Sequence, residues 1–314
     1  MSRVAIIILN YNTWEYTNNC IDSIIKQDYK NYDMFLVDNE SRNDSLEKIC
    51  AHLKEICKEH TIIEENQEVD LESRIIVIKA KENNGYAAGN NIAIMKAIDT
   101  KKYDLYWVIN NDTVVEKDTL NLMVECIEND KYRRPVGNFV FYYDQKDIMQ
   151  MAGGLEISKF NFKPYFSNKK ERIDYLGGVS YLIDNKFISK YGLMEEEYFL
   201  NSEDLEYFYK YKLDFIKSNK NELPFNVIGK IYHKESATQG KISPMSNYYY
   251  SRNLLYSCKK LNPKIMINLY IFFIIRIIKW SILNKEMAKS IILAIRDYKR
   301  CIKGKVGYFN KKEK

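Results

Sequence analysis

The sequence lacks the glycine-rich loops with which many nucleotide-binding proteins hold phosphates. No G-x-G-x-x-G follows the first apolar run, and no G-x-x-x-x-G-K-[ST] occurs in the 314 residues. The loop after that run reads Asn10-Tyr11-Asn12-Thr13, without the glycines and basic residues expected of a sugar-nucleotide pyrophosphorylase. These absences argue against a nicotinamide-dependent dehydrogenase, a P-loop hydrolase and a pyrophosphorylase.

Cysteine is sparse and unpatterned. The six cysteines are scattered, no C-x-x-C pair is present, and the N-terminus opens on an apolar run without the features of a secretory signal. This usage is typical of the reducing cytosol. We therefore expect a cytoplasmic protein.

Acidic residues are scarce only near the C-terminus. Residues 259–314 hold 15 Lys and Arg against 3 Asp and Glu, a net charge of +12, whereas the whole chain carries +6. Residues 1–258 therefore carry −6. A basic segment can meet nucleic acid or an anionic membrane. Because no nucleic-acid-binding motif accompanies the charge, the membrane is favoured and no nucleic-acid partner is expected.

Apolar runs rich in β-branched residues alternate with helix-period segments over the first 115 residues. The expected strands are 4–9, 34–37, 74–79 and 105–109, and the expected helices are 16–27, 46–58 and 87–98. This alternation predicts an α/β fold, with a mostly parallel central sheet and helices on both faces.

Polar residues follow each of the four expected strands. They are Asn10-Tyr11-Asn12, Asp38-Asn39, Glu82-Asn83-Asn84-Gly85 and Asn110-Asn111-Asp112. Because the carboxyl ends of parallel strands meet at one edge of the sheet, these loops should form one ligand site there.

The rest of the chain is less regular. Residues 135–235 contain Gly177-Gly178, an acidic helix start at Glu203-Asp204 and His233, and residues 248–262 look helical. We expect a catalytic domain over 1–255, with a nucleotide-binding half at 1–115 and an acceptor half at 116–255. Residues 256–314 would form a basic, amphipathic helical extension.

The order and spacing of eight segments resemble family 2 glycosyltransferases with the GT-A fold. The resemblance covers about residues 4–255 and is closest to rhamnosyl- and other hexosyltransferases of bacterial polysaccharide assembly. The segments are IILNYN (7–12), LVDNES (36–41), ENNGYAAGNN (82–91), WVINNDT (107–113), YLGGVSYLI (175–183), YFLNSEDLEYFYK (198–210), IYHKESATQG (231–240) and YYYSRN (248–253).

The resemblance implies a site for a UDP- or dTDP-sugar donor in the first half. Asn10, Tyr11 and Asn12 would line the base pocket, and Asp38 would accept the N3–H of uracil or thymine. A carboxylate at this place can also cap a turn before the next helix.

The donor diphosphate would lie beside the loop that precedes the helix expected at 87–98. Asn83, Asn84 and Gly85 would face the diphosphate at the helix N-terminus, where Gly allows close approach, and Asn90 lies one turn further on. Asn-Asn-Gly is also an ordinary turn signal.

A divalent cation, Mn²⁺ or Mg²⁺, is implied as cofactor. Asn111-Asp112 occupies the place of the family's acidic metal motif, and only Asp112 is ionisable. One carboxylate plus substrate phosphates is a usual arrangement for Mg²⁺. His233 resembles the family's late His motif and would be a second ligand, although a lone His after an apolar strand can also be structural.

The resemblance implies that Asp204 removes the proton of the acceptor hydroxyl, with Glu203 as the alternative base. Two acids at a helix start also favour the helix dipole without any catalytic role. Gly178 could lie against the donor sugar or merely form a turn. Arg252 suits contact with phosphate, either of the donor or of a diphosphate-lipid acceptor.

Residues 265–283 are long and apolar enough to cross a bilayer as a helix. Asn268, Arg276, Lys279 and Glu286 fall on one narrow stripe, however, which favours a helix lying in the plane of the membrane surface. Arg296, Lys299, Arg300, Lys303 and Lys305 would then attract anionic lipid over residues 265–305. Packing on the catalytic domain or on a second copy is the alternative. We expect peripheral attachment to the inner face of the cell membrane.

The sequence therefore predicts an inverting, non-processive glycosyltransferase that acts on a glycan or polyprenyl-linked acceptor in surface polysaccharide synthesis, such as capsule or O-antigen. The Gln-x-x-Arg-Trp motif that is usual in processive synthases is absent. The alternative is a catalytically silent glycan- or nucleotide-binding module of the same fold, suggested by Asn111 in the metal motif.

Overall fold

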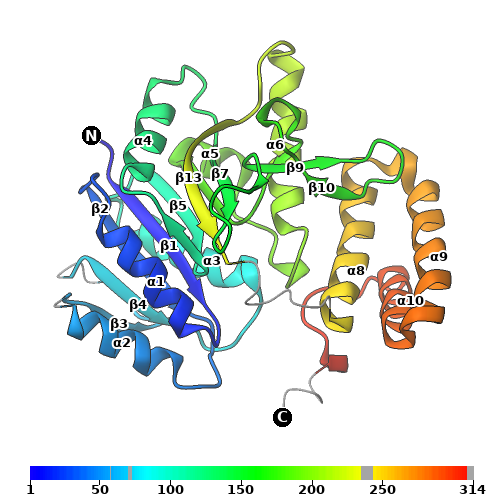
Figure 1. Cartoon of the computed structure of the whole chain (residues 1–314), viewed down its shortest axis with the longest axis horizontal. Coiled ribbons are helices and arrows are strands. Elements are labelled where there is room, and N and C mark those ends of the chain that lie inside the picture. Colours follow the sequence, from blue (N-terminus) through cyan, green and yellow to red (C-terminus); the bar gives the residue numbers. More distant parts are fainter. Residues whose placement is uncertain (57, 70–72, 235–242, 310–314) are drawn as a thin grey trace.

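The fold is built around a mixed sheet of ten strands. The structure is a computed structural model that describes residues 1–56, 58–69, 73–234 and 243–309 (Figure 1). The strands run in the order β3-β4-β2-β1-β5-β12-β7-β13-β6, and β8 pairs with β7. Their bounds are β1 (Val4–Asn10), β2 (Tyr32–Asp38), β3 (Thr61–Glu64), β4 (Ile75–Lys79), β5 (Leu105–Asn110), β6 (Thr113–Val115), β7 (Val136–Tyr142), β8 (Met149–Met151), β12 (Ser180–Asp184) and β13 (Asn226–His233).

Helices cover the sheet, and a small second sheet stands beside it. The α-helices are α1 (Trp14–Ile25), α2 (Ser45–Glu55), α3 (Tyr86–Asp99), α4 (Thr119–Asn129), α5 (Asn185–Tyr191), α6 (Glu203–Ser218), α8 (Pro244–Leu261), α9 (Met266–Leu283) and α10 (Lys285–Lys299). The second sheet has the order β10-β9-β11, from β9 (Gly154–Ile157), β10 (Pro164–Phe166) and β11 (Tyr175–Leu176). Four short 3₁₀ turns are η1 (Lys170–Arg172), η2 (Glu196–Tyr198), η3 (Pro263–Ile265) and η4 (Gly307–Phe309).

The first five strands along the sheet, β3, β4, β2, β1 and β5, are parallel, as the sequence predicts. Side chains of β1 alternate between two cores: Ile6 packs on one face of the sheet and Ile7 on the other. A continuous apolar run is what such a doubly covered strand requires. The expectation of an α/β fold is confirmed. β3 was not predicted, because its four residues, Thr-Ile-Ile-Glu, hold only two apolar side chains, which is too short a run to stand out.

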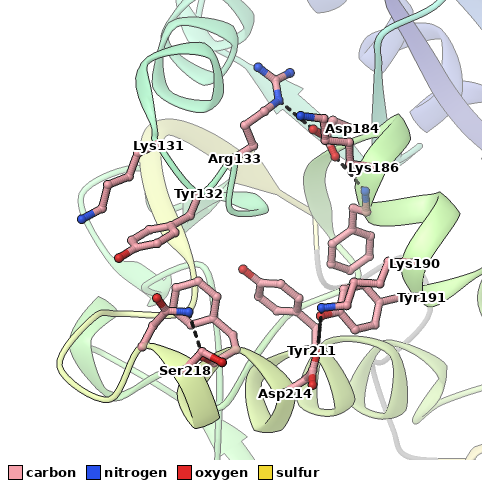
Figure 2. A pocket seen from close by; sticks show the side chains of 13 residues that line it. Lys131, Tyr132, Arg133, Asp184, Lys186, Lys190, Tyr191, Tyr211, Asp214 and Ser218 are labelled. Carbon is pink, nitrogen blue, oxygen red and sulfur yellow. Dashed lines mark hydrogen bonds and ion pairs between the residues drawn. The ribbon is translucent and has the colours of Figure 1, made fainter.

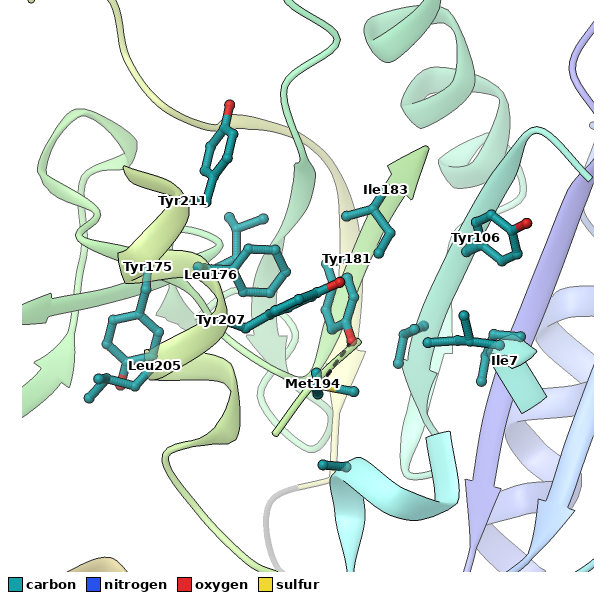
Figure 3. Packing of buried hydrophobic residues seen from close by; sticks show 14 of the residues in the cluster. Ile7, Tyr106, Tyr175, Leu176, Tyr181, Ile183, Met194, Leu205, Tyr207 and Tyr211 are labelled. Carbon is teal, nitrogen blue, oxygen red and sulfur yellow. Dashed lines mark hydrogen bonds between the residues drawn. The ribbon is translucent and has the colours of Figure 1, made fainter. Parts of the chain in front are cut away.

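Aromatic packing fixes α6 against the sheet. Tyr181 of β12 meets Phe208 of α6 edge to face, with ring centroids 4.9 Å apart. The Tyr181 hydroxyl also donates to the sulfur of Met194, at 3.3 Å (Figure 3). Leu205, one residue after the acidic pair, is buried in the same cluster. This packing holds the N-terminus of α6, which carries Glu203 and Asp204, at a defined place.

Three helices, α8, α9 and α10, stand together at one end of the molecule (Figure 1). α8 contacts α6, α9 and α10, and it therefore joins the C-terminal helices to the part of the fold that contains α6. The expected boundary at 255/256 falls inside α8. After α10 the chain returns toward the sheet, where the Lys305 ammonium donates to the backbone oxygen of Asn83 at 2.8 Å.

Candidate active site

The ends of β1, β2 and β5 lie side by side, as expected for a ligand-binding edge. Asn10 is paired in register with Asp38, and Leu9 with Asn110. A cavity of about 290 Å³ opens at this edge. It is lined by Tyr86, Asn110, Asp112, Gln150, Met151, Leu155, Pro164, Phe166, Tyr175, Gly177, Gly178, Val179, Leu200, Asn201, Ser202, Glu203, Asp204, His233 and Tyr250. Five of the sequence-predicted site residues are among them: Asp112, Gly178, Glu203, Asp204 and His233.

Asp38 is held by a network of donors outside that cavity. Its carboxylate accepts hydrogen bonds from Asn10 Nδ2 at 2.7 Å, from the Ser41 hydroxyl at 2.6 Å and from the Ser41 amide at 3.1 Å. Asn10 is wholly buried, and its Oδ1 accepts from the Thr17 hydroxyl. Asn10 thus positions Asp38. The bond from the Ser41 amide also closes the turn after β2, so Asp38 fits both the base-binding and the turn-capping hypothesis.

The loop before α3 is shaped by contact with Phe199, which lies just before α6. Gly85 has φ +101°, and a Cβ at this residue would lie 2.0 Å from the backbone oxygen of Phe199. The next amide, of Tyr86, donates to that same oxygen at 2.9 Å. The close approach that Gly85 permits is therefore to Phe199, and one of the first amides of α3 is already used inside the protein. Asn83 Oδ1 accepts from the Gly85 amide at 3.0 Å and from Asn39 Nδ2 at 3.1 Å.

The other residues that were predicted to bind the nucleotide-sugar differ in exposure. Tyr11 is half-buried and Asn84 is exposed. Asn12 has φ 58° and donates its amide to the Ser41 hydroxyl, which ties the loop after β1 to the loop after β2. Asn90 is buried; its Nδ2 donates to the Tyr86 oxygen, whereas its Oδ1 has no hydrogen-bond partner.

Asp112 and His233 meet because β6 pairs with β13. The register places His233 opposite Thr113, and His233 Nε2 lies 3.3 Å from Asp112 Oδ1. His233 Nδ1 lies 3.0 Å from the Gln150 side-chain oxygen. The Gln150 oxygen is placed to accept the proton of His233 Nδ1. In that tautomer Nε2 of His233 carries a lone pair that faces the Asp112 carboxylate. Asn111, by contrast, donates Nδ2 to the Thr13 and Thr17 hydroxyls at 2.8 Å each.

These residues fit a divalent cation. Asp112 Oδ1 is buried and has no hydrogen-bond donor, and a carboxylate that faces an imidazole lone pair is repelled unless a cation or proton lies between them. Carboxylate oxygen and imidazole nitrogen are both ligands for Mn²⁺. No group of three or more His, Cys, Asp or Glu side chains converges within the described residues. A cation at this place would therefore take its remaining ligands from substrate phosphates and water.

Glu203 and Asp204 begin α6 and face the cavity. Asp204 Oδ2 accepts from the Gly178 amide at 3.0 Å, and its Oδ1 accepts from the Leu205 amide at 2.7 Å. Glu203 is buried and its Oε2 has no hydrogen-bond partner. The Tyr86 hydroxyl closes this corner by donating to the Gly178 oxygen at 2.6 Å.

The two carboxyl groups differ in acidity for physical reasons. Burial, together with the charge of Asp204, raises the pKa of Glu203 to about 8. Burial also raises the pKa of Asp204, to about 6, but less, because the amides of Gly178 and Leu205 stabilise its ionised form. At neutral pH Asp204 is therefore the ionised member of the pair. This order of the pKa values favours Asp204 over Glu203 as a general base.

Arg252 lies away from the cavity. Its side chain is wholly buried; it donates to the backbone oxygens of Gly304 at 2.8 Å and Tyr198 at 3.2 Å. The guanidinium also lies over the ring of Tyr249. In this structure Arg252 ties α8 to the C-terminal segment, and its contact with phosphate stays a prediction.

Sequence reasoning missed several residues of the site. Gln150, Tyr86 and Tyr250 line the cavity. A glutamine in a short strand carries no distinguishing pattern, and the two tyrosines, although they lie in quoted segments, were given no role because tyrosine is common throughout the chain. Asn39 was quoted only as part of a motif, yet its Nδ2 bridges the Asn83 side chain and the Gly85 oxygen. Residues 235–242, which hold most of the His motif after His233, lie outside the described residues.

A second cavity, of about 330 Å³, lies at the opposite edge of the sheet. Its carboxylates are paired with cations: Arg133 lies 2.7 Å from Asp184, and Lys190 lies 2.7 Å from Asp214 (Figure 2). Tyr191 also donates to Asp214. Because these groups satisfy one another, this cavity offers no free base, and the chemistry belongs to the first cavity.

Comparison with known proteins agrees with the fold and gives the family. The model of Glycosyl transferase family 2 matches residues 5–192. Glycosyltransferase GlyG of Streptococcus pneumoniae is 24% identical over 144 residues, which are 46% of this chain and 41% of GlyG. An uncharacterized glycosyltransferase of Haemophilus influenzae is 21% identical over 85% of this chain and 80% of its own length. The chain thus spans less than half of GlyG.

Two solved structures share the fold at low sequence identity. The mannosyltransferase PcManGT from Pyrobaculum calidifontis, in complex with GDP-Man and Mn²⁺, superposes with a TM-score of 0.56 at 12% identity, covering 95% of this chain and 75% of that one. S. aureus TarS 1–349, in complex with UDP-GlcNAc, gives a TM-score of 0.55 at 14% identity, covering 96% and 81%.

Proposed function

The chain belongs to glycosyl transferase family 2 and is a GT-A glycosyltransferase that takes a sugar from a nucleotide-sugar donor; from this premise we propose an inverting, non-processive transfer from a UDP- or dTDP-sugar to a hydroxyl of a glycan or lipid-linked glycan. The observation that carries the proposal is the acidic pair at the start of α6. It lines the same cavity as Asp112 and His233.

The proposed reaction is a single displacement. The acceptor hydroxyl oxygen attacks the anomeric carbon of the donor, its proton passes to Asp204, and the bond from that carbon to the diphosphate oxygen breaks. The products are the glycosylated acceptor and the nucleoside diphosphate. The Gly178 and Leu205 amides hold both oxygens of Asp204, so the base needs little reorganisation to receive the proton.

Asp112 and His233 would hold the divalent cation, Mn²⁺ or Mg²⁺. When bound, the cation would offset the negative charge on the departing diphosphate. Gln150 orients His233 through Nδ1, which is the usual role of an outer partner of a metal-binding imidazole. PcManGT was solved with Mn²⁺.

The choice of a UDP- or dTDP-sugar rests on Asp38. An ionised carboxylate at the end of β2 can accept the N3–H of uracil or thymine, and Asn10 and Ser41 aim it by three hydrogen bonds. TarS, one of the structures with this fold, was solved with UDP-GlcNAc. Rhamnosyl or other hexosyl transfer in the assembly of a capsule, O-antigen or similar surface polysaccharide is the pathway that we propose.

The test is release of nucleoside diphosphate from a panel of UDP-, dTDP- and GDP-sugars, with Mn²⁺ or Mg²⁺. Wild type is compared with Asp204→Asn and with Asp99→Asn, the same chemical change at an exposed carboxylate at the end of α3. We expect metal-dependent turnover of one UDP- or dTDP-sugar, lost in Asp204→Asn and kept in Asp99→Asn. Binding of nucleotide with no turnover of any donor, even with added glycan acceptors, would favour a silent binding module.

A further inference from the structure

Most of the exposed residues of α9 are isoleucines; the others are Lys279, Ser281 and Leu283. Six isoleucines recur every three or four residues and are between 46% and 82% exposed. This isoleucine stripe is formed by Ile267, Ile271, Ile274, Ile275, Ile278 and Ile282. In the most apolar 18-residue stretch of this helix, only 11% is buried inside the protein. An exposed apolar patch of this size marks a surface that something else covers.

Two polar residues of α9, Asn268 and Arg276, face the protein instead of water. Arg276 donates to Asn247 Oδ1 at 2.7 Å and lies over the ring of Tyr250. Asn268 Nδ2 donates to the backbone oxygen of Phe160 at 2.9 Å. A surface helix of a water-soluble protein has the opposite orientation, with its apolar side on the core. Asn268 and Arg276, two members of the polar stripe predicted from the sequence, therefore contact the protein.

We propose that the isoleucine stripe lies in the interfacial layer of an anionic membrane, so that α9 is a docking surface for lipid. Exposed lysines border the stripe: Lys264 and Lys285 at the two ends of α9 and Lys279 beside Ile278. These three lysines have no ion-pair partner among the described residues. Apolar side chains with lysines at their border are the composition of helices that bind negatively charged lipid headgroups.

A second copy of the chain fits this surface less well than lipid. In a two-fold dimer the same patch is used on both subunits, so the lysine border of one stripe would meet the lysine border of the other. Like charges at such short range repel, whereas anionic headgroups neutralise them.

The helix lies on the membrane rather than through it. Leu269 and Phe273 are fully buried against the rest of the protein, and the bonds of Asn268 and Arg276 hold two further turns of α9 in place. A spanning orientation would break all of these contacts. α9 is long and apolar enough to span, but its packing leaves only the isoleucine stripe for lipid.

Only some of the basic residues that the sequence analysis assigned to lipid contact lie where lipid would be nearest. Lys303 pairs with Glu197, Lys305 donates to the Asn83 oxygen, and Arg296 pairs with Asp297. These three are engaged with protein groups, although Lys303 and Lys305 are exposed at the surface, as are Lys299 and Arg300. The lipid contact that we propose is therefore centred on α9 and its border lysines.

The docking surface continues toward the active site. Phe160, at the tip of the β9–β10 hairpin, is 67% exposed beside the start of α9, and Phe166 of the same hairpin lines the cavity. A lipid-linked acceptor held at the membrane would approach the cavity along this hairpin. That extension rests on the proposed function, whereas lipid binding by α9 does not.

The test is cosedimentation of the full chain with vesicles of phosphatidylcholine, with and without phosphatidylglycerol. The variant Ile274→Ser/Ile278→Ser breaks the stripe. The matched control, Ile62→Ser/Ile148→Ser, changes two isoleucines of similar exposure elsewhere, 45% and 51%. Lys279→Gln/Lys285→Gln tests the charge. All the changed residues lie outside the active site, so donor hydrolysis should persist and report folding.

We expect wild type and the control to bind vesicles with phosphatidylglycerol, and the stripe variant to bind at least about tenfold more weakly. The lysine variant should lose affinity only for the anionic vesicles. The proposal is overturned if wild type does not bind, or if the stripe variant binds equally well. It is also overturned if sedimentation shows a wild-type dimer that the stripe variant converts to monomer without any vesicle binding. Vesicle binding without turnover of any donor would instead leave this inference standing and count against the proposed function.

Discussion

Two groups of polar residues at the same edge of the sheet differ in how their hydrogen bonds are met. Around Asp38, three neutral donors satisfy both oxygens of the single carboxylate and leave Oδ2 able to accept one more hydrogen bond. In the cavity, Asp112 Oδ1 and Glu203 Oε2 are buried without a donor, although each belongs to an ionisable group. A buried polar oxygen without a hydrogen-bond partner costs far more than a satisfied one. The first group is built as a rigid binding surface, and the second is built to receive a cation or a proton.

The largest effect should come from removing the base in the second group. Asp204→Asn keeps the shape of the side chain but cannot accept the proton, so turnover should fall by about a thousandfold. Nucleotide affinity should stay within a few-fold of wild type, as measured by calorimetry with the nucleoside diphosphate and Mn²⁺. If affinity fell as far as turnover, Asp204 would belong to the binding surface and the contrast between the two groups would fail.

The next effect concerns the cation. Asp112→Asn leaves His233 as the sole protein ligand among the residues assigned here. The gain in nucleotide affinity that Mn²⁺ provides should therefore fall by about a hundredfold. Titration of nucleoside diphosphate with and without Mn²⁺ measures this gain directly. Asp99→Asn serves as the control, and an unchanged Mn²⁺ effect in Asp112→Asn would remove Asp112 from the metal site.

A smaller effect is expected in the first group. Asp38→Asn removes the acceptor proposed for the base N3–H, which should weaken binding of the nucleoside diphosphate by about tenfold and leave kcat within about twofold. Steady-state kinetics with the preferred donor separates the effect on binding, seen in KM, from the effect on kcat. A loss confined to kcat would mean that this network takes part in the chemical step.

The smallest effect is on stability. The pKa of Glu203 is raised by burial, so the folded state holds its proton more tightly than the unfolded state does. Stability from this group is full below its unfolded pKa of about 4.5 and is lost as pH rises toward 8. Glu203→Gln should therefore have a thermal midpoint that exceeds that of wild type by a few degrees at pH 8 but not at pH 4.5. Calorimetry at both pH values gives the comparison, and equal midpoints at pH 8 would show that Glu203 is not buried as a charge.

Local patterns predicted the elements that position the site, but not the contacts within it. The strand ends at Asn10, Asp38 and Asn110 followed from apolar runs, because each run ends where polar residues begin. The meeting of Asp112 with His233 depends on the pairing of β6 with β13, over a hundred residues apart, which no local pattern reveals.

The orientation of polar side chains was the least predictable feature. Helical spacing placed Asn268 and Arg276 on one stripe of α9 but could not say that this stripe faces Phe160 and Asn247. Arg252 likewise follows a run of tyrosines and resembles an exposed phosphate ligand in the sequence. Its partners, Gly304 and Tyr198, lie about fifty residues away on either side and become neighbours only through packing of the C-terminal segment.

The pH dependence of donor turnover tests the central claim most directly. Burial raises the pKa of Asp204 to about 6, so its basic form disappears as pH falls below that value. For wild type we predict that kcat/KM falls about tenfold per pH unit below pH 6 and is level just above it, whereas the residual rate of Asp204→Asn shows no such step. A variant that kept the wild-type rate and the same step near pH 6 would contradict the account.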